Sequence, residues 1–137
     1  MVRRATPDDA DAIGRLLYEF NREYDEPTPE APQIAARIRA VMATDTVVLL
    51  AGDGPDGLAV LRFRPSIWSA ALECYLAELY VVPERRGHGL GRALMEAAIA
   101  SAWSPPSSSS SAPPGRTTRP LSAIARRRTS APSRPPS

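Results

Sequence analysis

Hydrophobic residues in the first part of the chain recur every three or four positions, which is the period of an amphipathic helix. Thr6, Pro7 and two aspartates come directly before this stripe. They favour a helix start, because threonine caps N-termini, proline fits the first turn and acids favour the positive end of the helix dipole. A short strand is expected ahead of this start, over residues 2–5. The stripe consists of Ile13, Leu16, Leu17, Phe20 and Tyr24.

A second helix is expected after a proline-rich connection. Residues 26–32 contain three prolines and are predicted to form a loop. The pattern then predicts a helix over residues 33–44, whose apolar face carries Ile34, Ile38, Val41 and Met42.

Strand character dominates the middle of the chain. Residues 52–57 combine glycine, aspartate and proline, which is typical of a tight turn, so the runs on either side predict a β-hairpin. Residues 65–70, with Trp68, are expected to form a loop. The predicted strands are 46–51, 58–64 and 71–82. A third helix is expected over residues 89–103, which gives the order β-α-α-β-β-β-α.

The segment from Glu78 to Met95, ELYVVPERRGHGLGRALM, joins the last of these strands to the third helix through a glycine-rich turn. Glycine at positions 87, 89 and 91 lets backbone N–H groups close on an anion without obstruction by Cβ atoms. The helix that starts here adds unpaired first-turn N–H groups and the positive end of its dipole. These features predict a phosphate site, with a merely flexible turn as the alternative.

The spacing of the glycines separates two kinds of phosphate turn. A dinucleotide-binding fingerprint requires GxGxxG and an acid about 20 residues further on, whereas here the third glycine comes one residue early and no acid follows Glu96. The pattern Arg86-x-x-Gly89-x-Gly91, preceded by LYVVPE and followed by GRALM, resembles the coenzyme A signature of the GNAT superfamily of N-acetyltransferases. The order of predicted elements is similar to the first two thirds of the GNAT layout. This implies an α/β (α+β) fold with a mainly antiparallel sheet flanked by helices.

The resemblance implies transfer of an acetyl group from acetyl-coenzyme A to a primary amine of a small molecule or a protein N-terminus, without a metal. The pyrophosphate would bind the turn, the pantetheine arm would lie along the strand before it, and a backbone amide near Val81 would polarise the thioester carbonyl. The residues implied in coenzyme binding are Leu79, Tyr80, Val81, Val82, Arg86, Gly87, His88, Gly89, Leu90, Gly91 and Arg92.

Glu78 is the candidate general base. An ammonium with a pKa near 10 must lose a proton before it can attack, and burial among apolar neighbours would raise a carboxylate's pKa toward a useful range. Strict strand alternation would place Glu78 on one face with Leu72, Cys74, Leu76, Tyr80 and Val82. Polyamine acetyltransferases carry Glu-Asp at this point, but Ala77 takes the first of those positions. The alternative is that Glu78 pairs with Arg62 or Arg64.

Other candidates come from the regions that line the acceptor side of the cleft in this family. Tyr24 and Trp68 are the expected substrate contacts, with Tyr18 and Asn21 as further candidates. Arg85 and Arg86 are candidates for phosphate contacts or for a solvated pair. Cys74 is interpreted as a small strand hydrophobe, and as a single cysteine it fits a reducing, cytoplasmic compartment.

Charge divides the chain in two. Residues 1–103 contain 11 arginines and all 15 acids, a net charge of −4, whereas residues 104–137 contain six arginines and no acid. The second part is rich in serine and proline and lacks apolar residues to form a core, so it is predicted to be disordered. A GNAT-like domain over 1–103, incomplete because it is truncated or frameshifted after about Trp103, and a disordered tail over 104–137 are therefore expected.

Three functions remain open from the sequence. The first is an N-acetyltransferase, and the second is a catalytically impaired remnant of one. The third is a nucleic-acid-associated protein acting through the arginine-rich tail, which the absence of interleaved aromatic residues makes a weaker interpretation. A homodimer is compatible with the sequence, and no membrane partner is expected because no apolar run is long enough to span a bilayer.

Overall fold

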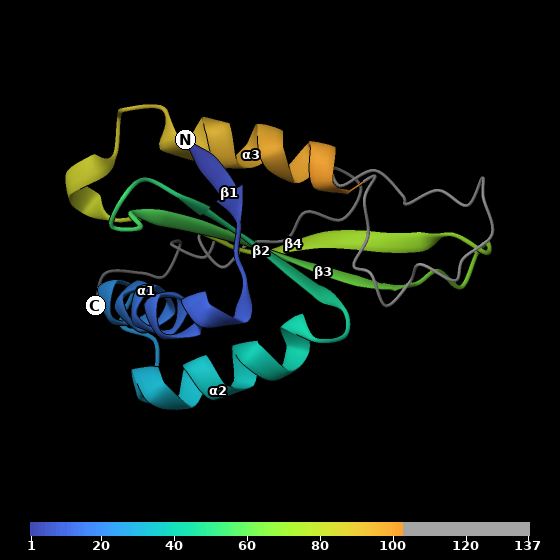
Figure 1. Cartoon of the computed structure of the whole chain (residues 1–137), viewed down its shortest axis with the longest axis horizontal. Coiled ribbons are helices and arrows are strands. Elements are labelled where there is room, and N and C mark those ends of the chain that lie inside the picture. The colour runs from blue at the N-terminus through green and yellow to red at the C-terminus, as the bar shows by residue number, and fades with distance from the viewer. Residues whose placement is uncertain (103–137) are drawn as a thin grey trace.

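The computed structural model describes residues 1–102, which form a four-stranded sheet between helices (Figure 1). The elements are β1 (Val2–Arg4), α1 (Ala10–Glu23), α2 (Ala31–Met42), β2 (Thr46–Ala51), β3 (Gly57–Pro65), β4 (Leu72–Val81) and α3 (Leu90–Ser101), with the short 3₁₀ helices η1 (Pro7–Asp9) and η2 (Pro83–Arg85) ahead of α1 and α3. The predicted order of elements is confirmed. Trp103, the predicted end of the third helix, and the predicted tail over 104–137 lie outside the described residues.

The sheet has the strand order β1-β2-β3-β4, and every pair of neighbours is antiparallel. Helices α1 and α2 cover one face and α3 covers the other (Figure 1). The first core packs side chains such as Ile13, Leu16 and Phe20 of α1 against Val48 and Leu58 of the sheet. The second packs Leu94 and Ala98 of α3 against the opposite face. The α/β fold with a mainly antiparallel sheet is therefore confirmed.

Helix α2 begins at Ala31, two residues earlier than the pattern predicts. Pro32 lies in the first turn of α2, where a backbone N–H would have no acceptor within the helix. Proline therefore loses no helical hydrogen bond there. Glu30 caps the helix, and its backbone N–H donates to Oε1 of Gln33 at 2.9 Å. The prediction of a loop up to Pro32 is wrong because proline terminates a helix only when it falls beyond the first turn.

Strand β4 contains one residue more than β3 over their paired length. Glu78 pairs with Val60 and Leu76 pairs with Leu61, so Ala77 is the extra residue of a β-bulge. A bulge interrupts the alternation of side chains between the two faces. Consequently Cys74 and Leu76 pack beneath α3, whereas Tyr80 packs beneath α1 and α2. The predicted single face that combined Leu72, Cys74, Leu76, Glu78, Tyr80 and Val82 is therefore wrong.

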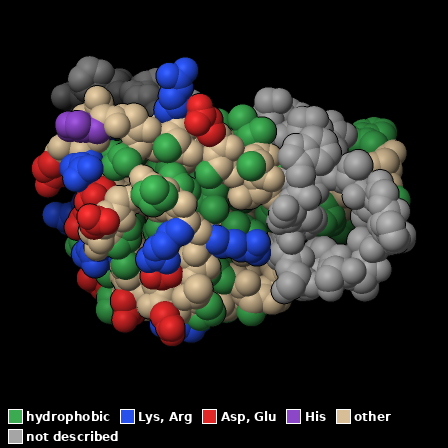
Figure 2. All heavy atoms as spheres, turned by 45° about the horizontal axis from the view of Figure 1, so that its top comes forward, with side chains coloured by type: hydrophobic (Ala, Val, Ile, Leu, Met, Phe, Trp, Pro, Cys, Tyr) green, Lys and Arg blue, Asp and Glu red, His purple; other side chains and the backbone are tan. Residues whose placement is uncertain are grey.

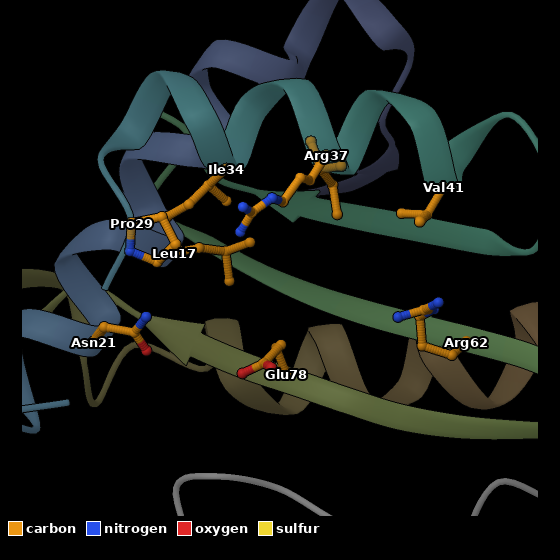
Figure 3. Close-up of a pocket in the computed structure, with 9 residues that line it drawn as sticks. Leu17, Asn21, Pro29, Ile34, Arg37, Val41, Arg62 and Glu78 are labelled. Carbon is orange, nitrogen blue, oxygen red and sulfur yellow. The ribbon is translucent and has the colours of Figure 1, made fainter. Parts of the chain in front are cut away.

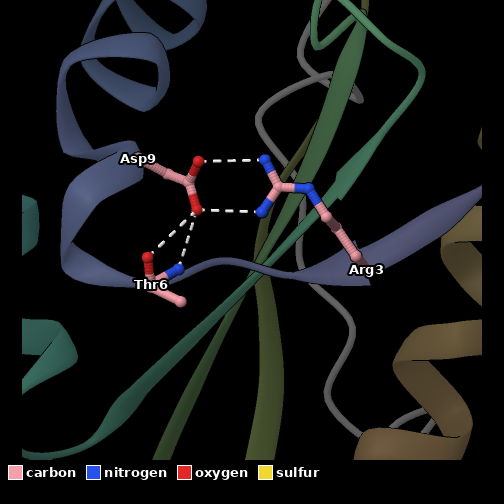
Figure 4. Close-up of polar contacts among 3 residues, drawn as sticks. All are labelled: Arg3, Thr6 and Asp9. Atoms are coloured by element: carbon pink, nitrogen blue, oxygen red, sulfur yellow. Dashed lines mark hydrogen bonds and ion pairs between the residues drawn. The ribbon is translucent and has the colours of Figure 1, made fainter.

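An ion pair fastens β1 to the start of the helical layer (Figure 4). Both terminal nitrogens of Arg3 donate to the carboxylate of Asp9 at 2.9 Å, and the backbone N–H of Thr6 donates to the same carboxylate at 2.8 Å. These contacts with Arg3 and Thr6 lower the pKa of Asp9 to about 2. Since Asp9 reaches both the strand and the turn, its charge stabilises the corner between them.

Replacing Asp9 with asparagine is expected to lower the free energy of unfolding by about 1 kcal/mol at pH 7, because the partly exposed pair is screened by solvent. A carboxylate with a depressed pKa stabilises the fold above its ordinary pKa near 4 and loses that effect as the pH falls toward 2. Urea denaturation at pH 7 and pH 2.5 measures this. Equal differences between Asp9→Asn and the wild type at both pH values would contradict a role for the charge.

Candidate functional site

The glycine turn lies between η2 and α3 and requires glycine at two positions. Gly87 has φ +82° and Gly89 has φ +87°, a left-handed conformation that side chains with a Cβ rarely adopt. A Cβ built at either position would meet nothing within 4 Å, so backbone conformation and not crowding requires the glycine. Gly89 is also the N-cap residue of α3.

The start of α3 offers donors toward solvent. Its first helical hydrogen bond runs from the N–H of Ala93 to the carbonyl of Gly89 at 3.0 Å. The N–H groups of residues 90–92 thus precede any acceptor within the helix, and the positive end of the dipole adds to them. Gly91 lies among these donors with φ in the ordinary range, and a Cβ there would come no closer than 4.0 Å to Cγ2 of Val81. The turn can therefore bind an anion through backbone groups alone.

The side chain of Arg86 points back toward the fold. Its Nε donates to the carbonyl of Val81 at 2.8 Å, and Nη2 donates to Oε1 of Glu23 at 2.9 Å. The guanidinium also lies 5.6 Å from the centroid of the Tyr80 ring. Arg86 therefore ties the turn to β4 and to the end of α1.

Tyr80 completes the same network. Its hydroxyl donates to Oε1 of Glu23 at 3.0 Å, and its ring stacks on Phe20 with centroids 4.8 Å apart. Burial, together with the neighbouring Glu23 carboxylate, raises the pKa of Tyr80, while the hydrogen bond from Arg86 lowers the pKa of Glu23. The phenol thus keeps its proton and the carboxylate keeps its charge, so the network is stable around neutral pH.

The remaining predicted residues of the turn are mostly exposed. Arg85 lies 3.7 Å from Asp56 as an ion pair, and Nδ1 of His88 lies 3.2 Å from the carbonyl of Arg85. Arg92 is 84% exposed and pairs with Glu96 one turn along α3. Leu90 is buried in the core beneath α3. In this group, only the exposed side chains of Arg85, His88 and Arg92 could contact a ligand at the turn.

The outer edge of β4 presents backbone groups at Leu79 and Val81. The N–H of Val82 donates to the carbonyl of Asp56 at 2.8 Å, on the side of β3. Backbone groups alternate sides along a strand, so those of Val81 and Leu79 point to the opposite edge. The bond from Arg86 to the Val81 carbonyl agrees with this direction. No strand among the described residues covers this edge.

A cavity of about 260 Å³ lies between α1, α2 and the strands β3 and β4 (Figure 3). Glu78 reaches it from β4, and Arg37 and Arg62 reach it from α2 and β3. The bulge at Ala77 lies directly before Glu78 in β4. The cavity is lined by Leu17, Asn21, Pro29, Ile34, Arg37, Ile38, Val41, Arg62 and Glu78.

The other acceptor-side candidates lie elsewhere. Trp68 is 77% exposed in the loop between β3 and β4 and does not line the cavity. Tyr24 follows α1 and packs edge-on against Phe20 at 5.5 Å, and Arg22 lies over the ring of Tyr18 at 5.9 Å. Of the four, only Asn21 contributes to the cavity. Sequence reasoning did not identify Arg37, because its helical position reads as solvent-facing.

The arginines proposed as alternative partners of Glu78 have acidic neighbours of their own. Nε of Arg64 donates to Glu73 at 2.9 Å, and Arg62 lies 3.6 Å from Asp45. Cys74 is fully buried, and burial raises the pKa of its thiol to about 12. It is therefore an apolar packing residue and not a nucleophile.

Charges on the described surface are mixed. Arginines and acids are interspersed with apolar side chains on the face seen in Figure 2, and neither sign forms a continuous patch over its described part. Within residues 1–102 no group of three or more potential metal-ligating side chains occurs. None of the helices in this stretch is both long and apolar enough to cross a membrane.

The antiparallel sheet and its flanking helices are arranged as in a solved acetyltransferase, and the chain is an acyltransferase of the acetyltransferase class. The model of the acetyltransferase (GNAT) family matches residues 13–105. The chain belongs to the GNAT acetyltransferase family.

Solved structures agree with this assignment. A protein from Arthrobacter sp. FB24 that is classed as an acetyltransferase is 48% identical, with a TM-score of 0.69 over 76% of this chain and 67% of its own. Two others share the fold at lower identity. The ribosomal-protein-alanine N-acetyltransferase of Brucella melitensis biovar Abortus 2308 is 17% identical, with a TM-score of 0.70 over 97% of this chain and 85% of its own. The aminoglycoside acetyltransferase meta-AAC0020 from an uncultured soil metagenomic sample, in complex with sisomicin, is 16% identical. Its TM-score is 0.58 over 71% of this chain and 65% of its own. No curated protein matches the chain.

Proposed function

We propose that this protein transfers an acetyl group from acetyl-coenzyme A to a primary amine. The observation that carries the proposal is the passage of β4, with Glu78 at the cavity, through η2 into a left-handed glycine turn that starts α3. The Glu78 carboxylate and the proposed anion site would then lie at the two ends of one short segment. Membership of the GNAT family supports the donor, because acetyltransferases of this fold generally use acetyl-coenzyme A.

The donor would bind through backbone groups of this segment. The N–H groups of the turn and of residues 90–92 would hold the pyrophosphate, as helix N-termini hold phosphates generally. The outward N–H and C=O groups of Leu79 would pair with the pantetheine arm in the manner of an added strand. In this proposal the side chain of Arg86 orients the turn, and Val81 N–H polarises the acetyl carbonyl.

The acceptor amine would react beside Glu78. The ammonium gives a proton to the Glu78 carboxylate, directly or through a water, and the freed lone pair forms a bond to the acetyl carbon. The carbon–sulfur bond would then break, the coenzyme would leave as a thiolate, and the former amine nitrogen would release its second proton to solvent as it becomes an amide. A thiol has an ordinary pKa near 8.5, so solvent can return the proton. Tyr80 is not required for that step, since its hydroxyl proton is held by Glu23.

Calorimetry with acetyl-coenzyme A, followed by release of free coenzyme A in the presence of a panel of amines, tests the proposal. The panel should contain amino acids, their amides, a polyamine, an aminoglycoside and a peptide with a free N-terminus. Binding together with amine-dependent release supports acetyl transfer. Binding without release from any amine, or no binding, would sink it.

A further inference from the structure

The cavity beside Glu78 has an apolar side and a polar side. Leu17, Ile34, Ile38 and Val41 form the apolar side, and they come from the helical layer. The volume of about 260 Å³ is slightly below the roughly 300–1,000 Å³ of pockets that hold drug-sized ligands. The cavity therefore suits a molecule of amino-acid size with an aliphatic body better than a large sugar.

The polar side contains more positive than negative charge. Arg37 descends from α2 and Arg62 rises from β3 into the space between helix and sheet, with Glu78 on the neighbouring strand (Figure 3). Arg62 has Asp45 at 3.6 Å, whereas Arg37 forms no ion pair with any residue in the described part of the chain. Arg37 is an exposed residue, and its guanidinium thus lines the cavity without a carboxylate partner among residues 1–102.

We infer that the acceptor is a small amine that also carries a carboxylate, namely an amino acid with an aliphatic side chain; this inference rests on the proposed acetyl transfer. Arg37 would bind the carboxylate through two parallel N–H donors, a geometry that guanidinium offers and ammonium does not. Glu78 would receive the amine, and the apolar side would hold the aliphatic chain. A polyamine or aminoglycoside has only positive charges to present to Arg37 and Arg62, so both are disfavoured.

The test compares L-leucine with L-leucinamide, which differ by the carboxylate charge. Calorimetry on the full chain, with and without saturating coenzyme A, is expected to show leucine binding at least ten times more tightly. Arg37→Gln is expected to remove this preference while leaving the affinity for acetyl-coenzyme A unchanged. Arg39→Gln is the matched control, because Arg39 is an exposed arginine of the same helix that does not line the cavity.

Distinct results overturn the inference and the proposed function. The carboxylate site would be overturned if leucine and leucinamide bound with equal affinity, or if leucine, isoleucine and methionine all failed to bind. It would also be overturned if Arg39→Gln had the same effect as Arg37→Gln. Acetylation of amines without preference for the acid would leave acetyl transfer standing and refute the inference. Leucine binding that depends on Arg37, without acetylation of any amine, would support the carboxylate site and refute acetyl transfer.

Discussion

Gly91→Val is expected to weaken acetyl-coenzyme A binding by more than 100-fold while leaving the fold intact. Gly91 lies among the unpaired N–H groups at the start of α3, and the branched side chain of valine would stand where a phosphate must approach. Within the protein the substitution is tolerated, since the nearest atom to a new Cβ is Cγ2 of Val81 at 4.0 Å. Valine also has a higher helix propensity than glycine. Calorimetry gives the affinity and thermal denaturation the stability.

Two companion variants make this result specific. Ala100→Val adds the same branch at an exposed position of α3, away from the turn, and should bind acetyl-coenzyme A like the wild type. Gly89→Ala should destabilise the protein by about 1 kcal/mol, because Gly89 has φ +87° and alanine is strained there. Unchanged affinity in Gly91→Val would show that the turn does not bind the coenzyme.

Glu78→Gln is expected to lower kcat by about 100- to 10,000-fold, which is the usual contribution of a general base. Glutamine keeps the shape of the side chain at the cavity and cannot accept the amine's proton. The affinity for acetyl-coenzyme A should not change, because Glu78 lines the acceptor cavity and not the turn. The residual rate should rise with pH toward the amine's own pKa near 10, since the free amine then forms without a base.

The control for this variant is Glu73→Gln on the same strand. Glu73 pairs with Arg64 at 2.9 Å and does not line the cavity, so its loss should leave kcat near the wild-type value. A wild-type kcat in Glu78→Gln would exclude Glu78 as the base. An equal loss in both variants would point to damage of β4 and not to proton transfer.

The periodic parts of the sequence predicted the fold well. The stripe from Ile13 to Phe20 packs into one core, and the hairpin around residues 52–57 forms as expected. The positive φ angles of Gly87 and Gly89 agree with a turn that needs residues without a Cβ. These features are local, so the residues within each segment are enough to determine them.

The acceptor side could not be predicted in the same way. Strict alternation assigned Glu78 and Cys74 to one face, because a pattern of period two contains no sign of an extra residue such as Ala77. Arg37 reads as a solvent-facing residue of an amphipathic helix. It lines the cavity together with Glu78 of β4, a strand distant in sequence, because α2 packs against α1 and β2.

The bond from Arg86 to the Val81 carbonyl has a consequence for self-association. An uncovered strand edge invites another chain to pair, and each added residue of such a chain needs both a donor and an acceptor. At Val81 the acceptor is already occupied by Nε of Arg86 at 2.8 Å, while the N–H stays directed outward. At this edge of the described sheet, binding of a molecule that offers a carbonyl acceptor is therefore favoured. Pairing with a whole strand from a second copy of the chain is disfavoured.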